Sequence, residues 1–492
     1  MPYRFWGLLD SCLAANEPSL AQNPTDPLNL IAGSNDQIAE PACSNTTPSS
    51  CPRPAGISVS GYYASFDGGL TWPATCQGLI DLSAFGEYAF GDPAQAFDSR
   101  GNAYYGTLAF PNGAVAGAAP SDLFVAKSTD GGCHYTSVTK ASGASNGIFD
   151  DKDGIAADAN VLSPFRDNVY AAWTKLAGKS VANQILFARS TDEGVTWSKP
   201  LHLSPADSTA ATLRSGAAVQ VGPDGTVYVI WVNTKGNSAK PAAIHMTISH
   251  DGGKTFLPLG QDITVATVTD DGFNQLLSGT SFRQSGRVFP SFTVAPNGTI
   301  HVVWSNHINN HAQVLATKST NGGLTWSAPV VAGDVTTPGN PNNRSAFFAS
   351  VTADPDNNVD VIFQALDDQP QGTSPGAGVV NYDTYFTQST NNGVSFGSPV
   401  KISTASSDPD GSSLNGRLRG QLLGDYITAV ADSTPGSHRV FAVWTDSRNA
   451  TPCPVIDVYR ATTPPPLQLP NVIADCPITF GNTDIFLGTV NY

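Results

Sequence analysis

Charged and phenolic side chains recur just before seven strand-like patterns, and their types could do chemistry. Four arginines precede four successive patterns, and each guanidinium can donate two bonds in a fixed plane, so a converging set suits a carboxylate ligand. Carboxylates occupy similar positions, where one can stay protonated while another stays ionised. The sequence predicts an acid–base site for an anionic ligand from a basic set of Arg214, Arg287, Arg344, Arg419 and Lys152, and an acidic or phenolic set of Glu17, Asp36, Asp92, Asp150, Asp151, Asp425 and Tyr426.

One octapeptide, Ser-x-Asp-x-Gly-x-Thr-Trp or a close variant, indicates how these residues are positioned. It occurs six times, at intervals of 59 to 70 residues. Its Asp or Asn can accept bonds from its own turn, its glycines supply positive φ and its aromatic residue packs beneath, as at the tip of a hairpin. The copies are Ser65–Trp72, Ser128–Tyr135, Ser190–Trp197, Ser249–Phe256, Ser319–Trp326 and Ser389–Phe396.

Two further strand patterns precede each octapeptide, so each unit is a four-stranded meander of about 65 residues. Repeated sheets without helices fit radial packing around a channel. We therefore predict an all-β chain forming a single β-propeller over residues 1–492, with seven blades favoured and six as the alternative. The first strands begin near Pro18, Pro93, Gly154, Gly216, Pro290, Phe348 and Tyr426.

The last unit lacks an octapeptide. Its third strand is either Ile456–Arg460 or, preferably, Asp484–Val490, with residues 453–476 as an insertion bounded by a disulfide. Within the N-terminal segment 1–17, residues 3–9 could supply the missing fourth strand and close the ring. The tryptophans that end second strands are expected to pack between blades.

The octapeptide resembles the Asp-box (BNR) repeat of sialidase-like propellers. That resemblance implies a site on the face opposite the octapeptide turns and six blades in true sialidases. It also implies an arginine triad, an Asp acid and a Tyr nucleophile activated by a Glu. The matching residues are Arg214, Arg287 and either Arg344 or Arg419 for the triad, Asp92 or Asp151 for the acid, Tyr426 for the nucleophile and Glu17 for its partner. Asp425 is a further substrate-binding candidate.

Composition narrows the classes of partner. Lys and Arg number 25 against 40 Asp and Glu, giving a net charge of -15, which argues against a nucleic-acid partner. The sequence contains no apolar run of 18 or more residues, so it predicts no membrane-spanning helix. We expect a monomer that binds a glycan or an acidic oligosaccharide.

Seven cysteines suggest an oxidising compartment. Cys43 with Cys51 and Cys453 with Cys476 lie close together in polar segments, and Cys76 could pair with Cys133, leaving Cys12 over. The sequence therefore favours an extracellular, secreted protein.

No cofactor is required by these motifs. Three Asp-rich segments near 150–154, 354–358 and 408–411 would permit a structural calcium, although none has complete EF-hand spacing.

These features favour a sialidase-like glycoside hydrolase acting on an exposed acidic sugar. The alternatives are a non-catalytic propeller that binds a glycan or protein, and a polysaccharide lyase using His307 or Tyr426.

Overall fold

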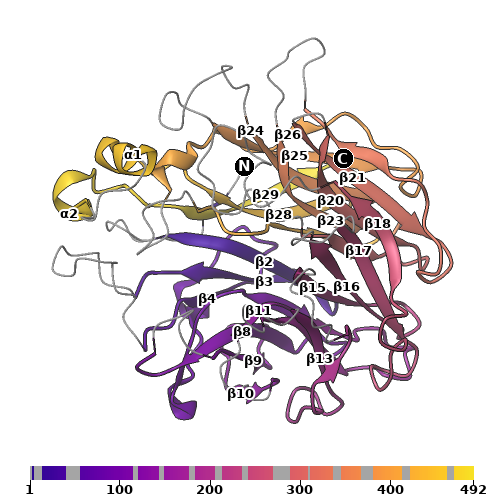
Figure 1. The fold of residues 1–492 in the computed structure, drawn as a ribbon. Coiled ribbons are helices and arrows are strands. Elements are labelled where there is room, and N and C mark those ends of the chain that lie inside the picture. The colour runs from indigo at the N-terminus through magenta and orange to yellow at the C-terminus, as the bar shows by residue number, and fades with distance from the viewer. Residues whose placement is uncertain are drawn as a thin grey trace.

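A computed structural model describes residues 3–4, 14–39, 56–114, 120–142, 149–176, 183–205, 213–234, 242–269, 289–308, 311–335, 345–366, 381–412, 422–462 and 470–492. Seven antiparallel sheets follow one another in chain order around a common axis (Figure 1). The predicted seven-bladed, all-β propeller is confirmed, and six blades are excluded.

Blades 1 to 3 hold the strands of the N-terminal part. They are β2 (Ala15–Asn23), β3 (Asp26–Asp36), β4 (Ser60–Ser65) and β5 (Gln77–Leu79); then β6 (Glu87–Ala89), β7 (Ala94–Phe97), β8 (Ala103–Pro111), β9 (Asp122–Ser128) and β10 (Ser137–Lys140); then β11 (Phe149–Ala157), β12 (Val169–Leu176), β13 (Gln184–Ser190) and β14 (Leu201–His202).

Blades 4 to 6 repeat the four-stranded order. They are β15 (Leu213–Val221), β16 (Val227–Thr234), β17 (Ala242–Ser249) and β18 (Ile263–Val268); then β19 (Ser291–Val294), β20 (Ile300–Ile308), β21 (His311–Ser319) and β22 (Val330–Gly333); then β23 (Ala346–Ala353), β24 (Val359–Leu366), β25 (Tyr382–Ser389) and β26 (Val400–Lys401).

Blade 7 combines both ends of the sequence. Its order is β27 (Thr428–Ala431), β28 (Arg439–Asp446), β29 (Asp484–Asn491) and β1 (Tyr3–Arg4), with β1 outermost. The third strand is thus the preferred candidate, whereas Ile456–Arg460 lies in a helix. The backbone N–H of Ala15 also donates to the Thr483 carbonyl at 2.9 Å, which joins blade 1 to the last blade.

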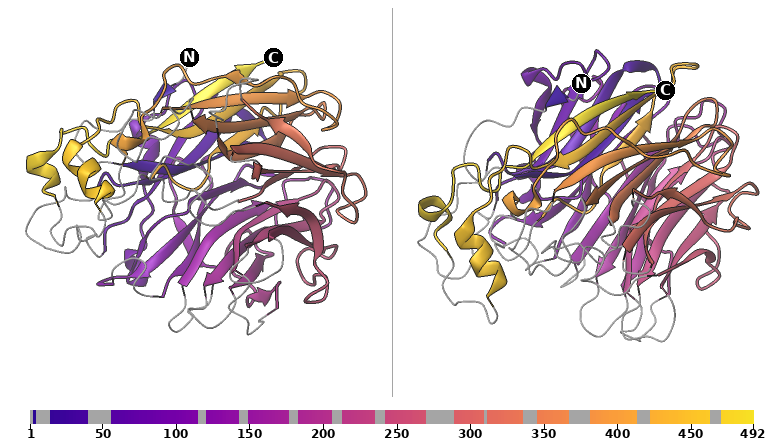
Figure 2. Two further views of the ribbon diagram at one scale, coloured as in Figure 1. Left: turned by 45° about the horizontal axis from the view of Figure 1, so that its top comes forward. Right: turned by 90° about the horizontal axis from the view of Figure 1, so that it is seen from above.

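The segment between β28 and β29 leaves the wheel. It contains helices α1 (Pro454–Ala461) and α2 (Val472–Asp475), and the Cys453–Cys476 disulfide joins its two ends. Figure 2 shows both helices projecting beyond the sheets. Three short 3-10 turns complete the described elements: η1 (Ala74–Cys76), η2 (Ser83–Phe85) and η3 (Pro409–Gly411). Neither α-helix, within the described ranges, is long and apolar enough to cross a bilayer.

Apolar burial between neighbouring sheets holds the wheel together. Each sheet is covered on both faces, so its central strands carry apolar side chains on both sides. Tryptophans that end second strands pack against the preceding blade: Trp231 contacts the blade 3 core and Trp444 the blade 6 core. The predicted packing role of these tryptophans is confirmed.

Each octapeptide forms the hairpin between the third and fourth strands of its blade. In blade 1 the Ser65 hydroxyl donates to Asp67 at 2.8 Å and accepts the Gly69 N–H at 2.9 Å, while Asp67 accepts the Thr71 N–H at 2.8 Å. Because antiparallel hairpins alternate between the two ends of a sheet, these turns lie at the end of the wheel opposite the starts of the inner strands.

Candidate functional site

The first strand of each blade lines the axis and begins with an irregularity at one equivalent position. In blades 1, 3, 4 and 6 the pairing of the first with the second strand slips there, as between Asn16 and Ser19. In every blade the equivalent residue lies two positions before the residue at which regular pairing of the first strand with the second strand begins or resumes. We call these residues the axial ring: Glu17, Asp92, Lys152, Gly216, Phe289, Phe348 and Tyr426.

Several axial-ring residues have a left-handed backbone. Glu17, Asp92, Lys152 and Phe348 have φ between 51° and 55°, and Gly216 has φ of 68°. Non-glycine residues reach this region only at a cost, and such strain is concentrated at functional sites and tight bends. Here the bend occurs near the start of five of the seven inner strands.

Lys152 is the cation of the axial ring. Its Nζ lies 3.6 Å from Glu17 Oε1 and 3.4 Å from Asp92 Oδ2, and it contacts the Asp425 carboxylate. The same ammonium is 5.7 Å from the ring centroids of Phe289 and Tyr426. One buried side chain of blade 3 therefore meets residues of blades 1, 2, 5 and 7.

The two carboxyls beside Lys152 differ in protonation. Burial, together with Asp92 and Asp425, raises the pKa of Glu17 well above its ordinary value despite Lys152. Burial also acts to raise the pKa of Asp92, but the Lys152 ammonium, a bond with Glu17 and the Lys152 N–H at 2.9 Å hold it below its ordinary value. The pKa values of Glu17 and Asp92 are thus shifted in opposite directions. The pKa of Lys152 lies well above its ordinary value because its three carboxylates outweigh the effect of burial.

A cavity of about 400 Å³ runs along the axis, bounded by all seven inner strands. Lys152 and Tyr426 of the axial ring line it, together with Asp425, which precedes Tyr426, and Asp153 of β11. Its volume falls in the range of small-molecule sites. Glu17 and Asp92 are not among its lining residues, although both contact Lys152.

Asp153 is the unusual carboxyl of this cavity. Neither of its buried oxygens has a hydrogen-bond partner. Its Oδ2 lies against β8, where a Cβ on Gly106 would come within 3.0 Å, so only glycine leaves it room. Burial and then Asp92 raise the pKa of Asp153 well above its ordinary value. The carboxyl oxygens of Asp153 are therefore buried in an environment that disfavours the charged form.

Tyr426 stays a neutral phenol. Burial raises its pKa well above the ordinary value, and Asp92, Glu17 and Asp153 add to the effect. The structure thus brings together four predicted site residues, Glu17, Asp92, Asp425 and Tyr426, but their environment does not favour a phenolate nucleophile.

Other predicted site residues lie elsewhere. Arg214 is buried, and its Nη1 donates to the carbonyls of Asn183 at 3.0 Å and Pro205 at 2.9 Å, so it ties β15 to blade 3. Asp151 lies in β11 opposite Thr174 and is not among the cavity-lining residues. Arg287, Arg344 and Arg419 lie outside the described residues.

Two further acidic candidates have local partners. Asp36 accepts a bond from the Tyr63 hydroxyl, and burial raises its pKa. Burial, followed by the charge of Asp122, raises the pKa of Asp150 to about 7.

Sequence reasoning missed Asp153 as a site residue and Phe289 as a ring member. The run 150–154 was interpreted as a calcium-like loop, whereas it lies in strand β11. The signal that could have found Asp153 was its place immediately after Lys152, at the point where an inner strand begins. Phe289 occupies the space beside Gly216, where a Cβ would lie 2.3 Å from the phenyl ring.

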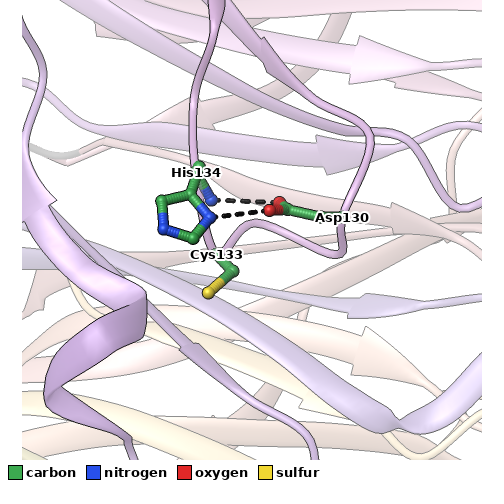
Figure 3. A group of neighbouring side chains, drawn as sticks. All are labelled: Asp130, Cys133 and His134. Atoms are coloured by element: carbon green, nitrogen blue, oxygen red, sulfur yellow. Dashed lines mark hydrogen bonds and ion pairs between the residues drawn. The ribbon is translucent and has the colours of Figure 1, made fainter.

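Two groups of potential metal ligands also occur in the described part of the chain. Figure 3 shows the first, Asp130, Cys133 and His134, in the blade 2 octapeptide. The Asp130 carboxylate binds the His134 N–H at 3.0 Å and its ring Nδ1 at 2.8 Å, while Cys133 forms a disulfide with Cys76. The turn and the disulfide therefore account for this group.

The second group joins Asp354, Asp356 and His438 at the boundary of blades 6 and 7. Asp354 accepts from the backbone of Asp356 at 2.9 Å and from the Tyr492 hydroxyl at 3.1 Å, so this cluster also has protein partners. A structural calcium stays a prediction.

Residues 168–359 match the family model described as a BNR repeat-like domain. This stretch covers three octapeptides and runs from blade 3 into blade 6. This part of the β-propeller therefore resembles BNR repeats.

Solved structures similar to this β-propeller include two sialidases and an arabinanase. The Hadza microbial sialidase Hz136 is 15% identical with a TM-score of 0.43; the match covers 73% of this chain and 63% of that one, so it spans less than two thirds of the sialidase. The Penicillium chrysogenum α-L-arabinanase is 12% identical with a TM-score of 0.43, and the match covers 81% of this chain and 92% of the arabinanase. The intramolecular trans-sialidase from Ruminococcus gnavus is 12% identical with a TM-score of 0.41, and the match covers 91% of this chain and 93% of the trans-sialidase. Comparison with curated protein sequences finds no match.

Proposed function

We propose that this β-propeller is a glycoside hydrolase that takes one sugar residue into the axial cavity. The observation that carries this proposal is the presence of two unlike carboxyls among the residues that line one cavity: Asp153, whose pKa is raised by burial, and Asp425, in an ion pair with Lys152. Glycosidic cleavage uses such a pair, one acid to protonate the leaving oxygen and one carboxylate to act as nucleophile or base.

Each residue has a role in this proposal. Asp153 donates its proton to the glycosidic oxygen, and the Asp425 carboxylate acts on the anomeric carbon or on a water. Tyr426, as a neutral phenol, can donate a hydrogen bond to the sugar. The proposed enzyme is secreted and monomeric, in keeping with its Cys76–Cys133 and Cys453–Cys476 disulfides.

The test is turnover on a panel of aryl glycosides that includes a sialoside, a uronide and an arabinofuranoside. Asp153→Asn and Asp425→Asn should each lower kcat by about 10² to 10⁴ on any cleaved substrate. Asp81→Asn is the matched control, because Asp81 is exposed and accepts only from the Ser83 turn. Full activity in both cavity variants would refute the assignment of these roles.

A binding propeller is the second candidate. It is favoured by the close mutual pairing of Lys152 with three carboxylates, since such a cluster can persist without reacting. It predicts saturable sugar binding without product, and loss of binding in Asp425→Asn. The lyase alternative gains no support from Tyr426, whose raised pKa makes it a poor base. The side chain of His307 lies outside the described residues.

A further inference from the structure

We propose that Lys152 is the positioning residue of the axial site: its ammonium fixes the Asp425 carboxylate at the cavity wall, and Glu17 and Asp92 fix the ammonium. The catalytic part of this inference rests on the proposed function, whereas the positioning itself does not. The same cation links blades 3 and 7, which are not neighbours in the wheel, through one contact at the axis.

The first step concerns how Lys152 reaches the axis. Its φ of 52° marks a bend within β11, and its own N–H donates to Asp92 Oδ2 at 2.9 Å. Backbone and ammonium therefore bind the same carboxylate of blade 2. A side chain anchored at both ends has little freedom to leave the axis.

The second step concerns charge. Only 7% of Lys152 is exposed, and an ammonium so buried is tolerated only with paired carboxylates. The titratable groups around it are Glu17 of β2, Asp92 before β7, Asp151 and Asp153 of β11, and Asp425 and Tyr426 before β27. Of these groups, the carboxyls of Glu17, Asp92 and Asp425 contact the ammonium.

The third step concerns the aromatic contacts of Lys152 and the burial of its partner Asp425. Its ammonium lies over the faces of Phe289 and Tyr426, so these two aromatic members of the axial ring add to the contacts that restrain it. Asp425 lines the cavity and is only 3% exposed, so without this cation it would be an uncompensated buried charge.

The experiment is a double-mutant cycle of Lys152→Met and Asp425→Asn, followed by urea unfolding at pH 7. Lys152→Met should raise the unfolding equilibrium constant by about 100-fold or more, and adding Asp425→Asn should recover at least tenfold of that loss. Lys140→Met with Asp122→Asn is the control cycle, because that pair, 2.7 Å apart, is partly exposed in blade 2. It should show less than about fivefold coupling.

Folding failure is also informative. A double variant that folds where Lys152→Met does not would support the pairing. Strictly additive effects, or a double variant that stays unfolded while Asp425→Asn folds, would overturn it.

The pH profile of kcat/KM separates positioning from a purely structural role. Lys152→Arg keeps the cation and should keep the acid limb of the profile, whereas any folded Lys152→Met protein should move that limb to higher pH by more than about one unit. An unmoved limb in Lys152→Met would overturn the positioning role. If the wild-type protein cleaves no sugar, the proposed function fails by itself, and the unfolding cycle still decides whether Lys152 fixes Asp425.

Discussion

The carboxyl groups of Glu17 and Asp92 lie beside the same ammonium, yet their pKa values move in opposite directions. Burial raises the pKa of Glu17, whereas at Asp92 the effect of burial is outweighed by the Lys152 ammonium, a bond with Glu17 and the Lys152 backbone N–H. One buried cation and one backbone donor therefore distinguish two otherwise similar acids.

This asymmetry predicts unequal effects of two isosteric substitutions. The raised pKa of Glu17 favours its neutral form, so Glu17→Gln should change the unfolding free energy by less than about 1 kcal/mol at pH 7. Asp92→Asn removes a charge paired with Lys152 and should cost about 3 kcal/mol. Urea unfolding of the two variants measures the difference, and equal losses would contradict the opposite pKa shifts.

A second prediction concerns Asp360 and pH. The Tyr492 hydroxyl lies 3.0 Å from Asp360 Oδ2 and 3.1 Å from Asp354 Oδ2, and burial raises the pKa of Asp360 to about 7 from its ordinary value of 3.8. A single phenolic proton cannot serve both carboxylates, so the second bond requires a proton on one of them, and Asp360 is the candidate.

Because folded Asp360 retains a proton that the unfolded chain releases, its contribution to stability falls as pH rises from 3.8 to about 7. Asp360→Asn removes this loss. Its unfolding free energy relative to wild type should therefore improve up to about pH 7 and then level off in a urea series. A difference that is constant across the series would show that Asp360 is ionised throughout.

A third prediction compares copies of the octapeptide. In blade 4 the Thr255 hydroxyl donates to Asp251 at 2.6 Å. Burial acts to raise the pKa of Asp251, but this bond and others in the turn lower it to about 2. In blade 5 an amide replaces the carboxylate, and Asn321 Nδ2 donates to the Thr325 hydroxyl at 2.8 Å.

A charged acceptor makes a stronger bond, so Asn321→Asp should stabilise the protein by about 0.5 to 1 kcal/mol at pH 7. The reciprocal Asp251→Asn should lose a similar amount. Both changes are measurable as shifts of the urea midpoint, and a loss of stability in Asn321→Asp would count against the shared turn chemistry.

The fourth prediction concerns the disulfide between Cys76 of blade 1 and Cys133 of the blade 2 octapeptide, 57 residues apart. Replacing both by Ser should lower the unfolding free energy by about 2 to 4 kcal/mol. The Cys453–Cys476 pair is the control, since it closes the helical segment outside the wheel. Removing Cys453–Cys476 should lower Tm less than removing Cys76–Cys133 in a calorimetric scan. A larger loss on removing Cys453–Cys476 would contradict this prediction.

Much of the fold followed from local chemistry in the sequence. The octapeptides marked hairpin tips because Ser65 and Asp67 bond within their own turn, and the apolar strands around them required sheets on both sides. Seven strand starts then indicated seven blades. The cysteine pairs Cys76–Cys133 and Cys453–Cys476 were also identified from spacing and composition.

The sequence by itself determined the repeated units, their number and the acidic residues at their starts. Only the tertiary structure decided which of those residues share a site. Arg214 was turned to backbone carbonyls between blades, whereas Lys152, from the same stretch of its own unit, reached the axis. The physical reason is that contacts at the axis join residues hundreds of positions apart, such as Lys152 and Asp425, so no local pattern reveals which side chains meet.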